Sequence, residues 1–391
     1  MMRGFFVVVI LSFIAVPGYS QNLNDLSFGT DSTFEVLTWN IEHFPKDDQT
    51  TIDYVKQIIE ELDVDVLALQ EISDTVLFKE MVGSLQGYQG YFKSSWFAGL
   101  AYIYKSETVE VQDIYEIYTT SPYWSAFPRS PMVIHFSYRE ESYILINNHF
   151  KCCGDGVLDL NNPDDEETRR YNASQYLKDF VDTEFHEENV IVLGDLNDLL
   201  TDDPENNVFQ MFLEDSLNYR FADMEIATGN SSQWSYPGWP SHLDHLLITN
   251  EFFDEMEREG SEVQTLKIDE YLAGGFSEYD AHISDHRPVG IKFAPKTATD
   301  MLNLEHANRN FYNFPNPFRG VTTFQLDRVP KATHIEIFNL EGKKVETIRL
   351  HKRQHIVHWK AFGFTGGVYI AKLFHDNQLL GATKMIFQSQ N

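Results

Sequence analysis

The sequence contains only two cysteines, and they are adjacent, at Cys152 and Cys153. This scarcity excludes a disulfide framework as the basis of the fold, because such frameworks need several spaced cysteines. A zinc site built from this pair is disfavoured as well, since chelating cysteines are normally separated by intervening residues. In an oxidising compartment the pair either closes a vicinal disulfide or stays reduced, and the sequence leaves both states open.

Long hydrophobic runs are also missing after the N-terminal stretch. That stretch combines Arg3, an apolar run over residues 5–16 and the small residues Gly18 and Ser20, which together predict a secretory signal peptide over residues 1–20. Its apolar run is shorter than the roughly 20 residues that a membrane-spanning helix needs. We therefore expect an exported mature chain without a transmembrane segment.

Basic residues are few: 30 lysines and arginines stand against 59 aspartates and glutamates, a formal net charge of −29. Such a composition argues against broad binding to nucleic acid, which depends on many cations that neutralise phosphates. It does not exclude cutting a nucleic acid at one metal-centred site. The charge is also uneven, since residues 311–391 hold 11 basic and 5 acidic residues. This asymmetry predicts two modules of different character.

Strand-like and helix-like segments alternate between residues 32 and 294, which predicts an α/β architecture. Apolar and β-branched runs predict strands over residues 34–39, 64–70, 100–104, 131–137, 143–148, 190–193, 246–249 and 289–293. Helices are expected over residues 49–62 and 166–181. Before the second helix, Asn162 is a candidate cap and Pro163 suits the first turn. We therefore interpret the acidic residues 164–166 as side chains that stabilise the positive N-terminal end of this helix rather than as a calcium-binding loop.

The pattern changes after Lys296, where the chain becomes polar and loses its apolar period. We interpret residues 296–310 as a linker and residues 311–391 as a small all-β sandwich, because short alternating segments there are separated by tight turns. The predicted order is a signal peptide over residues 1–20, an N-terminal segment over 21–33, an α/β domain over 34–295, the linker and the β-sandwich.

Short polar motifs recur along the α/β domain, and most of them directly follow predicted strands. In chain order they are Thr38-Trp39-Asn40, Gln70-Glu71, Asn148-His149, Gly194-Asp195-Leu196-Asn197-Asp198, Leu243-Asp244-His245 and Ser284-Asp285-His286-Arg287-Pro288. Functional loops of α/β proteins gather at the carboxyl ends of strands. The set supplies hard oxygen ligands for a divalent cation, amides for a phosphate, and histidines backed by carboxylates. This inventory suits the hydrolysis of a phosphoester.

In their order and spacing these motifs resemble the endonuclease/exonuclease/phosphatase superfamily over residues 34–294. The resemblance implies a four-layer α/β sandwich, in which two packed β-sheets are flanked by helices and the active site lies at one rim. It also implies a metal-dependent phosphoric ester hydrolase with Mg2+, or Mn2+, as the cofactor. By position, it implies metal binding by Glu71, Asn40 and Asp285, and catalytic roles for His149, Asp195, Asn197, Asp244 and His286.

Within this resemblance, Asp244 orients His286, and either His286 or Asp195 takes the proton from the attacking water. Candidate phosphate contacts are Asn40, Arg129, Lys151 and Arg170; for Arg129 a surface ion pair is the alternative. A histidine at position 149 narrows the resemblance to deoxyribonuclease-like, sphingomyelinase-like and extracellular-nuclease branches, since the repair endonucleases for abasic sites lack it. The neighbouring histidines are interpreted as structural or supporting: His242, His245 and His282.

Two aromatic segments flank the motifs, residues 233–240 before Asp244 and Tyr123-Trp124 before Arg129. Aromatic side chains at a rim either stack on bases or sugars, or pack their loops onto the body of the domain. The sequence leaves both interpretations open.

The tail resembles the C-terminal sorting domain of type IX secretion cargo, a module found in Bacteroidetes-type bacteria. The similarity rests on Asn313-Phe314-Pro315-Asn316-Pro317-Phe318, Asn339-Leu340-Glu341-Gly342 and Gly367-Val368-Tyr369-Ile370. It implies that the signal peptide carries the chain to the periplasm and that residues 311–391 engage the outer-membrane type IX secretion machinery. The chain would then be released or held at the cell surface. An ordinary carbohydrate-binding β-sandwich is the alternative.

The function predicted first is a secreted endonuclease that cleaves nucleic-acid phosphodiesters by metal- and histidine-assisted attack of water. The acidic body favours, as an alternative, hydrolysis of a phospholipid head group or a small phosphorylated molecule. The loop at residues 152–156 departs from that of the bacterial extracellular nucleases it resembles, which leaves the substrate open. A non-catalytic surface binding protein is disfavoured, because every catalytic position implied by the resemblance is filled.

Overall fold

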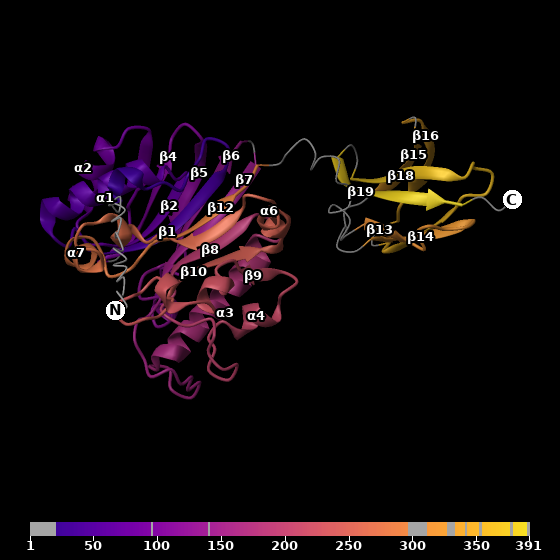
Figure 1. Ribbon diagram of the computed structural model, residues 1–391. Helices are drawn as coiled ribbons and strands as arrows, with labels where there is room; N and C mark the ends of the chain where they lie inside the picture. Colours follow the sequence, from indigo (N-terminus) through magenta and orange to yellow (C-terminus); the bar gives the residue numbers. More distant parts are fainter. Residues whose placement is uncertain are drawn as a thin grey trace, which may run out of the picture. The chain divides into compact units, whose positions relative to one another are not determined.

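The structure is a computed structural model that describes residues 21–94, 97–139, 141–295, 311–326, 333–340, 342–351, 354–375 and 378–388. The chain forms two compact units, Met1–Pro295 and Lys296–Asn391 (Figure 1). The predicted signal peptide over residues 1–20 and the predicted linker over 296–310 lie outside the described residues.

Two six-stranded sheets form the body of the first unit. The order in the first sheet is β11 (Glu262–Thr265), β12 (Val289–Phe293), β1 (Phe34–Phe44), β2 (Val66–Ile72), β4 (Gly99–Lys105) and β3 (Tyr88–Tyr91). In the second sheet it is β5 (Val109–Glu116), β6 (Met132–Tyr138), β7 (Glu141–His149), β8 (Val190–Asp195), β10 (Asp244–Thr249) and β9 (Tyr219–Phe221). Each sheet has one central parallel pair, β1 with β2 and β7 with β8. The carboxyl ends of these four strands supply the candidate site.

Helices cover the outer face of each sheet (Figure 1). The longer ones are α1 (Asp48–Leu62) and α2 (Thr75–Ser84) against the first sheet and α3 (Glu166–Glu184) against the second. The shorter helices and turns are η1 (Leu23–Asp25), η2 (Ser121–Tyr123), α4 (Gln210–Glu214), α5 (Met224–Ala227), η3 (Ser231–Gln233), η4 (Asn250–Phe252), α6 (Phe253–Met256), η5 (Ile268–Tyr271) and α7 (Phe276–His282).

Three apolar clusters separate four layers of secondary structure. On β1, Leu37 packs outward with Ile58 of α1, whereas Val36 packs inward between the sheets with Ile134 of β6. A third cluster joins the second sheet to Leu177 of α3. Strands buried on both faces need apolar residues at consecutive positions, which explains their near-continuous hydrophobic runs. The predicted four-layer α/β sandwich is confirmed.

All eight predicted strands of the first unit are present, and four more were not predicted. The missed strands, β3, β5, β9 and β11, are edge strands, three of them with four residues or fewer and β5 with mostly polar residues. The start of α3 also differs from the expectation. Asp165 caps it by accepting from the Thr168 backbone N–H at 2.8 Å, while Asn162 instead accepts from the Asp164 N–H at 3.2 Å.

A buried carboxyl pair lies at the amino ends of β1 and β2, opposite the end that carries the motifs. Glu35 is 0 % exposed and Asp65 is 2 % exposed, and the Glu35 backbone N–H donates to Asp65 Oδ2 at 3.1 Å. Burial, together with the charge of Asp65, raises the pKa of Glu35 to about 8. Thr33 and Thr108 donate hydroxyl hydrogen bonds to the two carboxyl groups. This pair is a structural feature of the sheet.

The second unit consists of two small antiparallel sheets. The order in the three-stranded sheet is β13 (Phe311–Phe314), β14 (Val321–Leu326) and β17 (Ile356–Lys360). In the four-stranded sheet it is β16 (Lys344–Arg349), β15 (His334–Asn339), β18 (Gly367–His375) and β19 (Gln378–Phe387). Buried residues of both sheets form one core. Asn316 ties the opening motif to β19 by donating to the Lys384 carbonyl at 2.6 Å and accepting from the Ile386 N–H at 2.8 Å. The predicted all-β module is thus observed.

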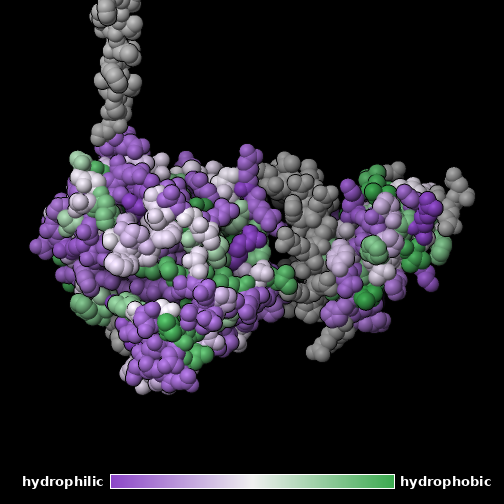
Figure 2. Space-filling view, turned by 60° about the horizontal axis from the view of Figure 1, so that its bottom comes forward, coloured by the Kyte–Doolittle hydropathy of each residue, from purple (hydrophilic) through white to green (hydrophobic). Residues whose placement is uncertain are grey.

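Hydrophilic side chains cover most of the first unit on the face shown in Figure 2. This agrees with the acidic composition of the chain. Across the part of the chain that the structure describes, a search finds no helix with the length and apolar character that crossing a membrane requires.

Candidate active site

The two parallel strand pairs bring the predicted residues to one rim of the sandwich. The register places Asn40 of β1 beside Gln70, the residue before Glu71. In the second sheet it places His149 beside Asp195, which also faces Asp244 across the antiparallel pair β8–β10. Residues far apart in the sequence therefore meet where the strands end.

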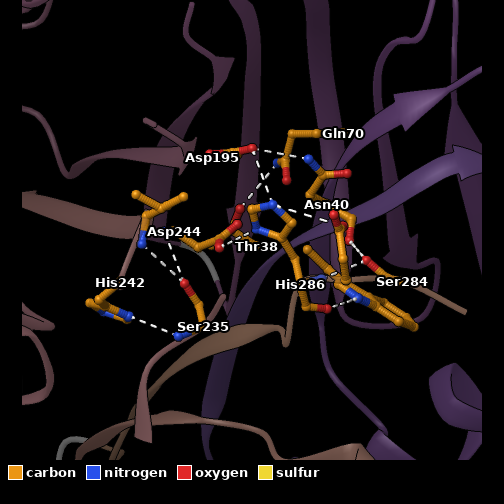
Figure 3. Close-up of polar contacts among 12 residues, drawn as sticks. Thr38, Asn40, Gln70, Asp195, Ser235, His242, Asp244, Ser284 and His286 are labelled. Atoms are coloured by element: carbon orange, nitrogen blue, oxygen red, sulfur yellow. Dashed lines mark hydrogen bonds and ion pairs between the residues drawn. The ribbon is translucent and has the colours of Figure 1, made fainter. Parts of the chain in front are cut away.

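Asn40 joins the two sheets through its side-chain amide (Figure 3). Its Nδ2 donates to Asp195 Oδ2 at 3.0 Å and lies 3.4 Å from Glu71 Oε1, while its Oδ1 accepts from the Glu42 N–H at 3.0 Å. The amide thus holds two carboxylates from opposite sheets close together. Glu71 has a positive φ of 65°, a conformation that bulky residues rarely adopt and that is concentrated at functional sites.

His286 forms a buried pair with Asp244, whose Oδ2 lies 2.7 Å from His286 Nδ1 (Figure 3). Burial alone would lower the pKa of His286, but the charges of Asp244 and Asp195 outweigh it and raise the pKa to about 10. The imidazole is therefore positively charged at neutral pH. Its Nε2 lies 3.8 Å from Asp195 Oδ2 and 4.0 Å from Asp285 Oδ1, so this nitrogen faces the centre of the site.

The backbone around His286 is fixed by hydrogen bonds to buried side chains. The Tyr279 hydroxyl donates to the His286 carbonyl at 2.6 Å and accepts from the Trp39 indole N–H at 3.0 Å. Ser284 Oγ accepts from the His286 N–H at 3.0 Å and donates to the Asn40 carbonyl at 2.7 Å. These contacts couple the position of His286 directly to Asn40 of β1.

His149 approaches Asp195 from the other side. Its Nε2 lies 3.4 Å from Asp195 Oδ2 and 3.9 Å from Glu71 Oε1. Burial, reinforced by the positive charges of Arg129 and His286, lowers the pKa of His149 well below its usual value. This imidazole is therefore neutral. Asp195 is itself buried, which raises its pKa to about 7.

The structure brings Asn197 and Arg129 to the same rim. Asn197 has a φ of 53°, its backbone N–H donates to Asp195 Oδ1 at 3.1 Å, and its Nδ2 donates to the Phe150 carbonyl at 3.3 Å. Arg129 is half-buried and donates from Nε to the Ala98 carbonyl at 3.3 Å. Its positive charge contributes to lowering the pKa of the buried His149.

Lys151 and Arg170 are held by the loop that follows His149. Lys151 Nζ donates to the Cys152 carbonyl at 2.8 Å and lies 3.8 Å from Glu166. Arg170 is 2 % exposed and donates to the Lys151 and Cys153 carbonyls at 2.8 and 2.7 Å. Because its guanidinium is occupied in this way, Arg170 is placed as a support of the loop rather than at the rim. The two cysteines are exposed free thiols with sulfur atoms 2.9 Å apart.

The rim carries oxygen atoms of the kind that a divalent cation prefers. Glu71 and Asp285 are partly exposed carboxylates, and the negative charge of Glu42, after burial, helps to raise the pKa of Asp285 to about 6. Glu71 and Asp195 also remain close to each other through Asn40. Mg2+ favours such hard oxygens and needs few carboxylates, since it keeps several waters. Glu71 and Asp285, with the Asn40 side chain beside them, would hold the ion.

Three residues near the site were missed in the sequence. Glu42 Oε2 accepts from the Asp285 N–H at 2.9 Å, and His43 Nδ1 lies 3.1 Å from Glu71 Oε2. Glu42 and His43 lie two and three residues after Asn40, so the continuation of that motif was the available signal. Asp223 accepts from His242 and His245, but it lies in no motif and carried no signal.

The aromatic residues of the two segments differ in their contacts and in their exposure to solvent. Tyr236 packs against His286 with ring centres 4.8 Å apart, and the Trp234 indole donates to the Ile226 carbonyl at 3.0 Å. Trp239 is 79 % exposed and Trp124 is 46 % exposed. Tyr236 and Trp234 stabilise their loop through these contacts, whereas the Trp239 ring is largely exposed.

Comparison with known families places this site in context. The profile of the Endonuclease/Exonuclease/phosphatase family matches residues 37–286, which include every candidate site residue. The chain belongs to this family. Members of the family are phosphoric ester hydrolases that depend on divalent metals. A second profile, that of the secretion system C-terminal sorting domain, matches residues 313–388, so this family member carries an export signal at its C-terminal end.

Solved structures with a similar fold include D. rerio TDP2 in complex with a single-strand DNA product, at 12% identity and a TM-score of 0.49, covering 67% of this chain and 99% of that one. The human Nocturnin catalytic domain with a bound sulfate has 16% identity and a TM-score of 0.46, and the match covers 67% of this chain and 94% of that one. A Bacteroides vulgatus endonuclease/exonuclease/phosphatase has 16% identity and a TM-score of 0.48, and the match covers 68% of this chain and 100% of that one. Among curated protein sequences, none matches this chain significantly.

Proposed function

We propose that this family member is an exported Mg2+-dependent phosphodiesterase and that its substrate is nucleic acid. Family membership supports phosphoric ester hydrolysis, and the sorting domain supports secretion or attachment at the cell surface. The observation that carries the proposal is the arrangement around Asp195 Oδ2, with His149 Nε2 at 3.4 Å and His286 Nε2 at 3.8 Å. A neutral and a charged imidazole thus flank one buried carboxylate.

In the proposed reaction Asp195 is the general base. It accepts a proton from water while the water oxygen forms a bond to phosphorus and the bond from phosphorus to the leaving oxygen breaks. A general base works best when its pKa lies near the operating pH, and the pKa of Asp195 is about 7. His286 is unsuited to this role, because its pKa of about 10 leaves it already protonated.

The histidines serve the phosphate. The charged His286, oriented by Asp244, donates from Nε2 to a phosphoryl oxygen and stabilises the negative charge that develops in the transition state. The neutral His149 is placed to donate a hydrogen bond from its ring N–H to the leaving oxygen, which takes its proton from a solvent water. A magnesium ion held by Glu71 and Asp285 would add Lewis-acid polarisation of the phosphoryl group. Asn197, Arg129 and Lys151 are proposed as further phosphate contacts.

The test uses the mature chain, residues 21–391, with supercoiled plasmid and with a chromogenic phosphodiester, each with Mg2+ and with a chelator. Metal-dependent nicking of the plasmid is expected. Turnover of the small diester without nicking of the plasmid would indicate that the substrate is a lipid head group or a small phosphoester instead of nucleic acid. The acidic body favours this alternative. Inactivity on both substrates would contradict phosphodiester hydrolysis.

Glu71→Gln tests the metal site. Removal of this carboxylate should raise the Mg2+ concentration for half-maximal activity by at least about tenfold, because a charged oxygen ligand is lost. Glu60→Gln, at an exposed position of α1, is the matched control and should leave the magnesium dependence unchanged. An unchanged magnesium dependence in Glu71→Gln would remove Glu71 from the proposed ligands.

A further inference from the structure

Three carboxylates lie close together outside the candidate active site, two of them in the segment that follows His149 and one at the start of α3. Asp155 lies in the loop after the two cysteines, Asp165 caps α3, and Glu167 lies in the first turn of that helix. One ligand atom from each residue lies within 4.8 Å of the other two. Oxygens bound to a common Ca2+ at about 2.3–2.6 Å lie within roughly 5 Å of one another, so the spacing is compatible with a shared ion.

Glu167 provides an independent indication of a ligand. It is 2 % exposed, and its Oε1 accepts from the Gly156 N–H at 2.7 Å and pairs with Arg170 at 3.2 Å. Its Oε2 is buried without a hydrogen-bond partner in the described part of the chain. A buried carboxylate oxygen without a donor is costly unless a cation contacts it. The loop backbone also lies close to this carboxylate, because a Cβ at Gly154 would lie 2.1 Å from Oε1 and 2.6 Å from Oε2.

The two other carboxylates each keep one oxygen for a ligand. Asp165 uses Oδ2 to cap α3, and Asp155 uses Oδ1 to accept from the Val157 N–H at 3.1 Å. No described residue donates to Asp165 Oδ1 or Asp155 Oδ2, and neither side chain is ion-paired within the described ranges. The helix-cap role of Asp165 is therefore compatible with a second role.

The local charge is also unbalanced. The guanidinium of Arg170 contacts both Glu167 and Asp198, at 3.2 and 2.7 Å, so one cation serves two carboxylates of the region. Asp155 and Asp165 add two further negative charges. Carboxylates packed this closely repel one another unless a counter-ion offsets their charge.

We propose that Asp155, Asp165 and Glu167 bind one calcium ion, at a site separate from the candidate catalytic metal. Calcium suits this site better than magnesium, since it accepts six to eight oxygens in flexible geometry and uses loop carbonyls and water readily. Extracellular calcium sites typically work at about 0.1–1 mM, and the sorting domain directs this chain out of the cell.

The ion would stabilise the segment that follows His149. Arg170, three residues after Glu167, donates to the Lys151 and Cys153 carbonyls and to Asp198 Oδ2 at 2.7–2.8 Å. Calcium on Glu167 would therefore link the loop, the start of α3 and the turn after β8 into one rigid unit.

Calcium titration of residues 21–391 by isothermal calorimetry tests the proposal, in a Glu71→Gln background that weakens the candidate catalytic site. One calcium ion per chain is expected, with a rise in the unfolding temperature. Adding Asp155→Asn should weaken calcium binding by at least about tenfold, because a charged ligand becomes neutral. Asp164→Asn is the matched control: Asp164 is exposed in the same segment but lies outside the cluster, so binding should persist.

Absence of calcium binding, or equal binding in the Asp155→Asn and control variants, would overturn the proposal. Asp155 is exposed, so its substitution should not prevent folding, whereas Glu167→Gln removes the buried ligand and serves as the second variant. Calorimetry reports binding directly. The result is therefore separate from whether the chain hydrolyses a phosphodiester.

Discussion

Two aspartate–histidine pairs meet on β10, and they differ in what faces the second imidazole nitrogen. In the first pair, His286 Nδ1 lies 2.7 Å from Asp244 and its Nε2 faces the rim without a hydrogen bond to another described residue. In the second, His245 Nδ1 lies 2.6 Å from Asp223 and its Nε2 donates to the Asp198 carbonyl at 2.9 Å. Asp244 and His245 are neighbours in the sequence and point to opposite faces of the strand.

The difference separates a reactive histidine from a structural one. Both nitrogens of His245 face acceptors, so it is a charged and fully paired imidazolium whose pKa is raised by Asp223 despite complete burial. His286 is charged for the same reason, but one of its N–H groups remains available for a phosphate. Burial next to an aspartate thus does not define a catalytic histidine; the unused nitrogen does.

Asp244→Asn should break the first pair with the largest effect on rate. Without the carboxylate, the pKa of His286 falls and its orientation is lost, so kcat/KM on a phosphodiester should fall by about 10²-fold or more. The alkaline limb of the pH–rate profile should also move to lower pH, because His286 must be protonated to stabilise the phosphate. A profile that matches the wild-type profile would contradict the role assigned to Asp244.

Asp223→Asn should break the second pair and act on stability. It leaves the charged His245 buried without its counter-ion, which should lower the free energy of unfolding by about 3–5 kcal/mol. Urea unfolding measures this change. The kcat/KM of the folded fraction should stay within about tenfold of wild type, and a loss as large as that of Asp244→Asn would show that the two pairs do not differ in kind.

Glu35→Gln sharpens the comparison, because the Glu35–Asp65 pair is buried without a histidine. The pKa of Glu35 rises from 4.5 to about 8 on folding, so the folded state binds the proton more tightly. The wild-type free energy of unfolding should therefore fall as the pH rises from 4.5 towards 8, by at most about 1.4 kcal/mol per pH unit. Glutamine mimics the protonated carboxyl and should flatten this dependence in unfolding curves measured across that range; an unchanged slope would contradict it.

Much of this arrangement was predictable because the rim follows regular strands. Asn40, Glu71, His149 and Asp195 sit at or directly after the ends of buried apolar runs, and such runs are the clearest strand signal in a sequence. The four edge strands were not predictable in this way, since they are short or mostly polar.

Residues that act through tertiary contacts carried no local signal. Asp223 follows the three-residue strand β9, and its partners lie 19 and 22 positions further along the chain. The sequence offers Arg170 as a candidate phosphate contact, and only the fold shows it buried against Asp198 and Glu167. Pairing of this kind depends on which helix face packs on the sheet.

The most direct measurement compares phosphodiester hydrolysis by the wild type, His286→Ala and His245→Ala, each with Mg2+, with a chelator, and after Mg2+ is restored. We predict that chelation abolishes wild-type turnover and that magnesium restores it. We also predict that His286→Ala loses about 10³-fold or more in rate while remaining folded, and that folded His245→Ala stays within about tenfold of wild type. Turnover that survives chelation, or that is equal in His286→Ala and wild type, would contradict the account.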